Sequence, residues 1–468
     1  MSKKRNVLFI ALCFITSLAQ AQSLSFDQAW QILQAKNNSI AAQRANLNHF
    51  KKLHKASKSL NYPSVSLGAN YVRLDDDVTL SNEDAFDNLD DNTQSLMNSL
   101  LTNASYDYGV NYAGILAGSS TLAEKQSLTS SITALWAIYT GGKITAAQHY
   151  SKAKEEEAKA NLAMETQKRF QDLSQFYYSV VLAKGVVETR RSVEKGLKQH
   201  RDFSIKLEQQ GQIAKVERLQ ADAALSKATV DRKKAEMNLD IARLALTEVL
   251  NQEVEVMPNS PLFINDRLPP LSDFTHQTLN SYPGLDMLTA KKKQAESAIK
   301  SEKSDYLPKV FLYGNYNVYE DETLASKMTP DWFVGIGVNI ALFDNSGRSE
   351  KVQAAESSVL QVRYLYQQAM QDLSVLVKKT YFQAKQAIQE VQGLDANLIL
   401  AEENLKLRVK AFNQGLSTSV DVVDAELFLA NIQIQQQVAK YNYVIALNNL
   451  LSLSSQMSDF TRYQQTAI

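Results

Sequence analysis

The sequence predicts a mostly α-helical protein built from two copies of one unit, with two β-strands in each copy. The 468 residues include only 16 Gly and 8 Pro, so few signals end a helix and long helices are expected. Blocks of sequence recur in the same order in the two halves. Four segments alternate between apolar and small or polar residues, which is the period of a β-strand. The charges balance at 50 Lys and Arg against 50 Asp and Glu, and without a basic surplus we expect no nucleic-acid partner.

Residues 1–21 are predicted to be a secretory signal peptide. Basic residues 3–5 precede an apolar run over 7–18, and Ala19-Gln20-Ala21 has the small-x-small pattern of a cleavage site. The alternative is a membrane anchor, but the run is shorter than the roughly 18 apolar residues that span a bilayer. The single cysteine, Cys13, follows bulky Leu12 within this run, which is a poor position for lipid attachment. No later apolar run is long enough for a spanning helix, so strands would have to make any membrane crossing.

The internal repeat defines the predicted domains. At an offset of 245, residues 45–71 match 290–316, and at an offset of 204, residues 210–225 match 414–429. The first block includes the identical pairs Lys58/Lys303, Pro63/Pro308 and Tyr71/Tyr316. In the second block, Glu217/Asp421 and Asp222/Glu426 keep their charge. We therefore expect a first repeat over 22–250, a linker over 251–274, a second repeat over 275–453 and a C-terminal tail over 454–468.

Four strands are predicted, around 65–73, 132–139, 310–319 and 332–343. Each places apolar residues on one face and small or polar residues on the other, and aromatic residues lie in or beside the runs. A soluble, half-buried strand has the same period, but the aromatic ends favour membrane strands that face lipid on one side and water on the other. Because four strands are too few to close a barrel around a pore, several chains must contribute, and three chains give about twelve strands. We therefore expect an obligate trimer.

The predicted helices have matched lengths. Residues 143–210 and 347–414 are 68 residues each, which corresponds to roughly 100 Å of helix. Shorter helices are expected over 22–60, 216–250, 275–306 and 420–453, so that two of them stacked end to end match one long helix, with the 257–270 connection at mid-height. Heptad spacing on the last helix, interrupted by Gln437 and Asn448, favours coiled-coil packing. An ordinary coiled-coil core without a transport role would show the same spacing.

The sequence offers no catalytic, cofactor-binding or metal-binding constellation. The five histidines lack the His-Glu-x-x-His spacing and are expected on the surface: His49, His54, His149, His200 and His276. Gly335-x-Gly337 lacks the third glycine of a dinucleotide loop and lies in a predicted strand.

The segment between the first two strands is strongly acidic. Residues 74–122 contain no Lys or Arg, and eight of their nine acidic residues lie within 75–91. Hard cations prefer oxygen ligands, so weak divalent binding is one hypothesis. The alternative is a plain solvated extracellular loop, which the absence of a glycine-containing calcium loop favours.

The order and spacing of these elements resemble the TolC-like outer-membrane efflux proteins over nearly the whole mature chain. The resemblance rests on the opening Leu24-Ser25-Phe26-Asp27-Gln28-Ala29, on Tyr62-Pro63-Ser64 and Leu307-Pro308-Lys309, on Leu342-Phe343-Asp344 with Gly347-Arg348, and on residues 415–425. It implies a homotrimer with a 12-stranded barrel in outer-membrane lipid and a helical tunnel across the periplasm. It also implies partners, a periplasmic adaptor and an inner-membrane transporter, and a channel that catalyses nothing. The first strand-to-helix turn, residues 139–143, departs from the pattern by being one residue shorter.

The resemblance also assigns roles to two sets of residues near the predicted helical tips. Asp421 and Asp424 match the acidic pair that lines the periplasmic entrance of the tunnel, and three chains would bring six carboxylates around one axis. From the residues alone, Thr418-x-x-Asp421 is equally typical of a helix-capping box. The tip turns, with Gly211, Gln212, Gly415, Leu416 and Ser417, are the expected adaptor contacts.

The function alternative is a secreted coiled-coil structural or adhesive protein. It would use the same helical seams and the same acidic surface, but it would not need alternating strands with aromatic ends. A passive conduit need not recognise its cargo, so the sequence names neither the cargo nor the pump.

Overall fold

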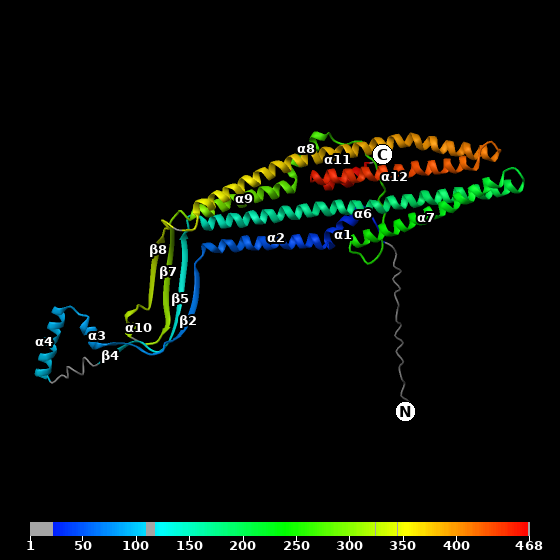
Figure 1. Cartoon of the computed structure of the whole chain (residues 1–468). Coiled ribbons are helices and arrows are strands. Elements are labelled where there is room, and N and C mark those ends of the chain that lie inside the picture. Colours follow the sequence, from blue (N-terminus) through cyan, green and yellow to red (C-terminus); the bar gives the residue numbers. More distant parts are fainter. Residues whose placement is uncertain (1–21, 109–117, 323, 344, 467–468) are drawn as a thin grey trace, which may run out of the picture. The chain divides into compact units, whose positions relative to one another are not determined.

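The computed structural model describes residues 22–108, 118–322, 324–343 and 345–466 (Figure 1). The predicted signal peptide lies outside the described residues. The chain forms two compact units, and each takes segments from both predicted repeats. The helical unit comprises Met1–Phe50, Lys154–Lys292 and Gln361–Ile468, and the sheet unit comprises Lys51–Ala153 and Lys293–Leu360. None of the described helices is both long enough and apolar enough to cross a membrane.

The two long helices predicted from the sequence are confirmed. Helix α6 (Lys143–Gln209) has 67 residues and α11 (Arg348–Asn413) has 66. Each continues through a tip turn into a 35-residue helix, α7 (Lys215–Val249) or α12 (Ser419–Leu453). The long helices of the two copies have nearly the same length, and each is uninterrupted because Gly and Pro are scarce within these segments.

The prediction of one helix over residues 22–60 is wrong. The segment forms a short strand β1 (Gln22–Leu24), helices α1 (Phe26–Lys36) and α2 (Asn38–Ser57), and a 3₁₀ turn η1 (Lys58–Asn61). The helices break at Asn37, whose backbone is extended and whose Oδ1 accepts hydrogen bonds from the backbone N of Ser39 at 3.0 Å and of Ile40 at 3.1 Å. An Asn side chain that competes for backbone donors in this way ends one helix and begins the next.

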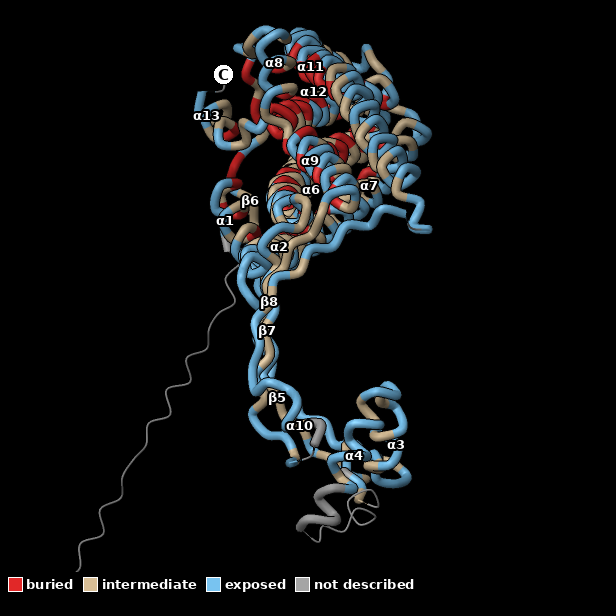
Figure 2. Tube along the Cα trace, turned by 90° about the vertical axis from the view of Figure 1, so that its left-hand side faces the viewer, coloured by how far each residue is buried: buried red, intermediate tan, exposed pale blue. Residues whose placement is uncertain are grey.

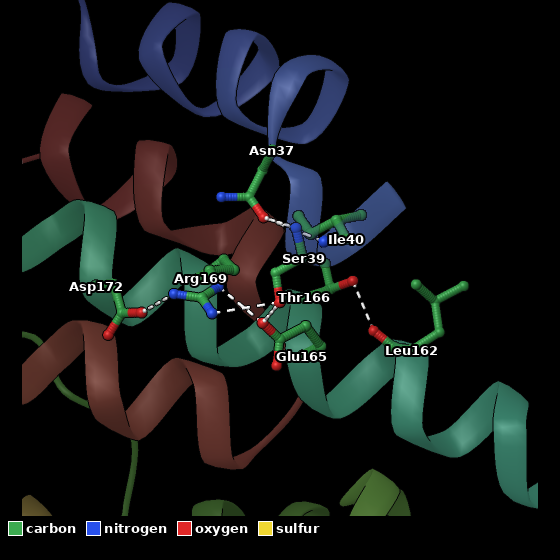
Figure 3. Close-up of polar contacts among 8 residues, drawn as sticks. All are labelled: Asn37, Ser39, Ile40, Leu162, Glu165, Thr166, Arg169 and Asp172. Atoms are coloured by element: carbon green, nitrogen blue, oxygen red, sulfur yellow. Dashed lines mark hydrogen bonds and ion pairs between the residues drawn. The ribbon is translucent and has the colours of Figure 1, made fainter. Parts of the chain in front are cut away.

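Polar contacts fasten this break to α6, as Figure 3 shows. The Ser39 hydroxyl donates to the Glu165 carboxylate, which also accepts from Nε of Arg169 at 2.7 Å. Arg169 reaches Asp172 at 3.1 Å as well. Burial alone would raise the pKa of Glu165, but the hydrogen bonds from Ser39 and Arg169 outweigh it and hold the pKa below its usual value.

The predicted helix over 275–306 begins earlier and is divided. Helix α8 (Leu271–Ser281) starts inside the predicted linker, and α9 (Pro283–Ser304) follows after Tyr282. Pro283 opens α9 because a proline is well suited to the first helical position but cannot continue a helix from before. The C-terminal tail adds a 3₁₀ turn η2 (Met457–Asp459) and helix α13 (Phe460–Gln465).

The core of the helical unit gathers around aromatic side chains from distant segments, and Figure 2 shows its buried residues in red. The rings of Phe170, Tyr177, Tyr178 and Phe460 all contact Phe26. Beside them, β1 pairs in parallel with β6 (Val256–Pro258), a small sheet that the sequence reading missed. The Tyr177 hydroxyl donates to the Leu24 carbonyl at 2.7 Å and so ties this sheet to α6.

The sheet unit contains one four-stranded antiparallel sheet in the order β2-β5-β7-β8. Its strands are β2 (Ser64–Arg73), β5 (Gln126–Tyr139), β7 (Lys309–Glu320) and β8 (Trp332–Asn339). All four predicted strands are present, but β5 starts before residue 132 and β8 ends before 343. The first part of β5 is rich in Ser and Thr, which concealed its alternation.

The acidic segment has secondary structure of its own. A small antiparallel sheet pairs β3 (Val78–Ser81) with β4 (Ser119–Ala123), and helices α3 (Asn82–Asp87) and α4 (Asp91–Tyr108) lie between these strands in the chain. Among the described residues between β7 and β8, the structure has the short helix α10 (Leu324–Met328) and no further strand or helix. The two copies therefore differ most in this connection.

Candidate functional site

One face of the four-stranded sheet is apolar across all of its strands. Leu67, Ile132, Tyr316 and Trp332 are successive register partners on this face. The chain leaves many of its side chains exposed: Val65 67%, Leu67 70%, Val334 71%, Ile336 65% and Val338 66%. A contiguous apolar face of this size requires an apolar partner.

The opposite face of the sheet carries small and polar residues together with the aromatic rings of Phe311, Tyr313 and Phe333. The hydroxyls of Ser66 and Thr133 bond to each other across β2 and β5 at 2.7 Å. Gly335 and Gly337 of β8 lie beneath the rings of Tyr313 and Phe311, where added Cβ atoms would meet ring carbons at 2.6 and 2.5 Å. The glycines therefore make room for aromatic rings on this face. The sheet is two-sided, as the alternation predicts.

Charged residues organise the turns where the strands meet helices within the sheet unit. The Asp305 carboxylate pairs with Lys143 at 3.1 Å and with Lys309 at 2.9 Å. The Arg348 guanidinium donates to the carbonyl oxygens of Asp305 and Ala341, each at 3.0 Å. At the same end of the sheet, the Trp136 indole donates to the Asn61 carbonyl at 2.8 Å. Both strand-to-helix turns are fixed by these contacts, including the shorter first one.

The acidic segment uses several of its carboxylates in local hydrogen bonds. Asp84 and Asp90 accept from the hydroxyls of Ser81 and Thr93, and Asp77 accepts from the Lys125 backbone N. Within the part of the chain that the structure describes, no group of three His, Cys, Asp or Glu side chains is placed to hold a metal ion. The cation hypothesis receives no support from this arrangement.

The tip turns of the two copies have the same geometry. Gly211 and Gly415 adopt positive φ angles of 71° and 73°, which glycine tolerates without strain. Gln212 N bonds to the Leu207 carbonyl at 2.8 Å, and Leu416 N bonds to the Ala411 carbonyl at 2.9 Å. The Leu416 side chain is 78% exposed. Both turns thus close the preceding helix in the same way. The second turn also leaves the apolar side chain of Leu416 exposed.

Asp421 takes part in the capping box that the sequence predicts. Its carboxylate accepts from the backbone N and the hydroxyl of Thr418 at 2.9 and 2.8 Å and from the Ser417 hydroxyl at 2.9 Å, while Thr418 Oγ1 accepts from Asp421 N. Arg408 lies 3.5 Å away. These hydrogen bonds, with Thr418 first, lower the pKa of Asp421 to about 2. Asp424, one turn further along α12, is exposed.

The expectation that all five histidines lie on the surface is wrong for His200. Its ring is 9% exposed, lies 4.6 Å from the Phe412 ring and bonds through Nε2 to the Ser419 hydroxyl at 2.7 Å. The Ser419 backbone N in turn donates to Glu217 at 2.6 Å. Burial lowers the pKa of His200, although the Glu217 charge acts in the opposite direction.

A helical spacing could have revealed this histidine. His200 shares an i, i+3, i+7 stripe with Phe203 and Leu207, and this stripe packs in the tip core with Phe412 and Val422. The tip turns of the first and second repeats are therefore joined through Ser419.

Comparisons with known proteins agree with this geometry. Residues 275–455 match the family described as outer membrane efflux protein. The alkaline protease secretion protein AprF of Pseudomonas aeruginosa is 20% identical over 278 residues, 58% of each chain. The outer membrane protein TolC of Vibrio cholerae is 23% identical over 205 residues, 42% of this chain and 46% of that one. The chain spans about half the length of these curated relatives.

The fold extends the likeness over nearly the whole chain. The crystal structure of the outer membrane protein VceC from Vibrio cholerae superposes with a TM-score of 0.70 at 12% identity, over 92% of this chain and 96% of that one. The family match over residues 275–455, the two relatives and the shared fold therefore agree with the resemblance of this chain to TolC-like outer membrane efflux proteins.

Proposed function

We propose that this chain is one protomer of a trimeric outer-membrane channel that serves as a passive conduit for export. The family that residues 275–455 match is described as outer membrane efflux protein. In this proposal the channel works with a periplasmic adaptor and an inner-membrane transporter, as part of a tripartite efflux pump or a type I secretion system. The chain itself catalyses no reaction.

The open sheet is the observation that carries the proposal. Among the described strands, β2 and β8 each pair on one side only, which leaves two edges with unsatisfied backbone donors and acceptors. A lipid environment does not tolerate such edges, so a sheet with a lipid-facing side must close. Joining β2 of one copy to β8 of the next, three times, turns four strands per chain into a barrel of twelve.

The two faces of the sheet fit the inside and outside of such a barrel. The apolar face, with Leu67 and Ile336, suits contact with lipid acyl chains. The face with Ser66, Thr133 and the two glycines of β8 suits a water-filled lumen. Strands of 10, 14, 12 and 8 residues bracket the roughly 9–11 residues that a tilted strand needs to cross a bilayer.

The helical tips supply the periplasmic entrance in this proposal. Asp421 and Asp424 lie one turn apart on α12, so three copies around one axis would concentrate six carboxylates and favour cations. Asp421 also caps its helix, and the two roles are compatible because Asp421 remains 37% exposed while it does so. The turns with Gly211, Gln212, Gly415, Leu416 and Ser417 are the proposed adaptor contacts.

Membrane extraction and crosslinking test the oligomer and the location. The channel proposal expects the protein to remain with the outer membrane until detergent is added, and crosslinking in mild detergent to stop at trimer. Release without detergent would favour the secreted coiled-coil alternative. Crosslinking that stops at monomer or dimer would contradict the trimer.

Single-channel recording tests the entrance. Asp424→Asn removes an exposed carboxylate, and we expect it to lower cation selectivity and to weaken block by multivalent cations. Thr418→Ala is the matched control, because it removes the cap partner and leaves both carboxylates in place. Selectivity and block unchanged by Asp424→Asn would contradict a role of Asp424 at the entrance.

A further inference from the structure

Helices α6 and α12 of the helical unit pack antiparallel through small residues on α6 and polar side chains on α12. A Cβ built on Gly196 would lie 2.6 Å from Oε1 of Glu426, and one built on Gly185 would lie 3.4 Å from the carboxamide of Gln437. The same register places Ser174 opposite Asn448, and both are 1% exposed. We call these three pairs the polar seam.

The polar seam has an 11-residue spacing on both helices. Glu426, Gln437 and Asn448 are 11 residues apart on α12, and Ser174, Gly185 and Gly196 are 11 apart on α6. Eleven residues make three turns of a nearly straight helix, so this spacing keeps all three pairs on one line. It accounts for Gln437 and Asn448, the two polar residues that interrupt the heptad pattern of α12.

Glu426 is the one ionisable member of the polar seam. Its carboxylate is half-buried against Gly196, and no cation pairs with it among the described residues. Its counterpart in the first repeat, Asp222, bonds to the Arg218 guanidinium. At the offset of 204 that relates the two tips, Val422 stands where the first repeat has Arg218. The second repeat therefore keeps the acid and lacks its counterion.

The charged groups around Glu426 are engaged elsewhere or exposed. About one helical turn after Gly196, the buried His200 of α6 bonds to Ser419, and Glu217 of α7 bonds to the same residue. Arg408 of α11 pairs with Asp421 of α12.

The remaining neighbours in sequence offer no counterion either. Next to Gly196, Glu194 pairs with Arg232 of α7, while Lys195 is exposed. On the facing stretch of α11, Glu403 pairs with Lys406. Burial is accordingly the single influence on the Glu426 carboxyl, and it raises the pKa of that group from 4.5 to about 7.

We propose that Glu426 is a proton-controlled contact between α6 and α12: the protonated acid lets the tip end of α12 pack on α6, and ionisation loosens that packing. The reason is that a half-buried carboxylate without a counterion loses hydration that nothing replaces, whereas the neutral acid does not. The proposal rests on the proposed function only in placing this end of the helices at the tunnel entrance. There it would make the entrance open more readily as the pH rises.

The direction of the pH effect follows from the raised pKa. The packed tip binds the proton more tightly than a loosened tip, in which the carboxyl has its ordinary pKa of 4.5. The packed state is therefore favoured fully at low pH, weakens as the pH rises from 4.5 to about 7, and changes no further above that. For the Glu426 proton, protection of the tip should fall by up to about tenfold per pH unit within this window. Burial lowers the pKa of His200, so His200 favours the packed tip as the pH rises toward 6.5 and acts against Glu426.

Hydrogen exchange on the full-length protein in detergent tests the proposal. Protection of segments 193–204 and 419–430, corrected for intrinsic exchange rates, is measured between pH 5 and 8.5. Relative to Glu426→Gln, we expect protection in the unmodified protein to fall up to pH 7 and then to level off, because His200 is present in both proteins. Glu426→Gln, which is isosteric and neutral, should show no fall in protection as the pH rises.

Two further variants extend the test: one should create the same pH dependence at another pair, and the other is a control. Gln437→Glu places a carboxylate over Gly185 and should give the surrounding segment the same pH dependence. Asp222→Asn alters the counterpart acid that already has a counterion, and it should leave the slope at 419–430 unchanged. A pH dependence of protection from pH 5 to 7 that is the same in the unmodified protein and in Glu426→Gln would overturn the proposal.

Single-channel recording over the same pH range separates this inference from the proposed function. Conductance that rises toward pH 7 in the unmodified protein and is constant in Glu426→Gln would support both. A protein with the expected exchange response that forms no channel at any pH would overturn the proposed function and leave the contact between the helices established.

Discussion

At the scale of single residues, two adjacent and equally buried tyrosines differ in their hydrogen bonds. Tyr177 and Tyr178 are both 0% exposed in the core of the helical unit. The Tyr177 hydroxyl donates to the Leu24 carbonyl and accepts from the backbone N of Ser260 at 2.9 Å and of Asn259 at 3.2 Å. The Tyr178 hydroxyl has no hydrogen-bond partner in the described structure. Only the first joins separate segments of the chain.

We therefore expect Tyr177→Phe to destabilise the helical unit by about 1–3 kcal/mol, because it leaves the buried backbone N–H of Ser260 without its acceptor. The Leu24 carbonyl keeps its bond from the Asn259 backbone N at 3.0 Å. Tyr178→Phe is the matched control and should be neutral or slightly stabilising, because its hydroxyl is already unpaired. Local opening measured by hydrogen exchange near residues 24 and 260 checks this. Equal effects of the two substitutions would contradict the assigned role of the Tyr177 hydroxyl.

At the scale of secondary-structure elements, the two tip turns close the preceding helix alike but begin the next helix differently. Helix α12 starts with the Thr418–Asp421 capping box. Helix α7 starts after Ala214, whose backbone is extended but whose side chain provides no cap. Glu217 occupies the matching third position of α7 and bonds to Ser419 instead.

This difference predicts opposite effects of two substitutions. Thr418→Ala should lower the stability of the first turn of α12 by about 1 kcal/mol, because an orphan backbone N–H loses its side-chain acceptor. Ala214→Thr should stabilise the start of α7 by about 0.5–1 kcal/mol, because the N-cap backbone is already extended. Hydrogen exchange of the two first turns measures both. A stabilising effect of Thr418→Ala would count against the cap.

Asp421 adds a pH dependence to the start of α12. Its pKa is lowered from 3.8 to about 2, so the stabilisation that its carboxylate gives is present above pH 3.8 and is lost as the pH falls through 2. This window lies below that of Glu426, whose pKa is raised to about 7. Exchange experiments above pH 5 therefore report on Glu426 without interference from the cap.

At the scale of the whole molecule, duplication supplies two pairs of strands from similar sequences, and together they form a single sheet. The first pair, β2 and β5, contributes one edge, and the second pair, β7 and β8, contributes the other. Each copy of the chain thus presents two different edges. In the proposed trimer such edges would pair head to tail between copies, which leads to a closed ring and not to a two-fold dimer.

The lipid-facing side of this sheet predicts how charge is tolerated. Leu67→Lys places an ammonium on the apolar face at a cost of about 2–4 kcal/mol near the bilayer centre, and it should reduce the amount of trimer in outer membranes. Ser66→Lys is the neighbouring control on the opposite face, where we expect assembly to proceed and conductance to change. Assembly impaired equally by both substitutions would contradict the assignment of the two faces.

Much of the fold could be predicted because it depends on local periods. The long helices, the four strands and the Thr418 cap each rest on residues within a few positions of one another, and these predictions are confirmed. The prediction of a single helix over 22–60 was wrong because Asn37 competes for backbone donors. The spacing of apolar residues gives no sign of such a side chain. The roles of Asp424 and of the tip turns in a channel stay predictions.

By itself the sequence determined the duplication, the element types and the two-sided sheet, because apolar residues repeat every two or every three to four positions. Only the tertiary structure decided that His200 is buried against Ser419, that Tyr177 is tied to Leu24, and that Glu426 lies over Gly196 without a counterion. Each of these contacts joins residues more than 150 positions apart. These contacts depend on the register between two packed elements, because a shift of one residue would pair different side chains. A local sequence pattern does not determine that register.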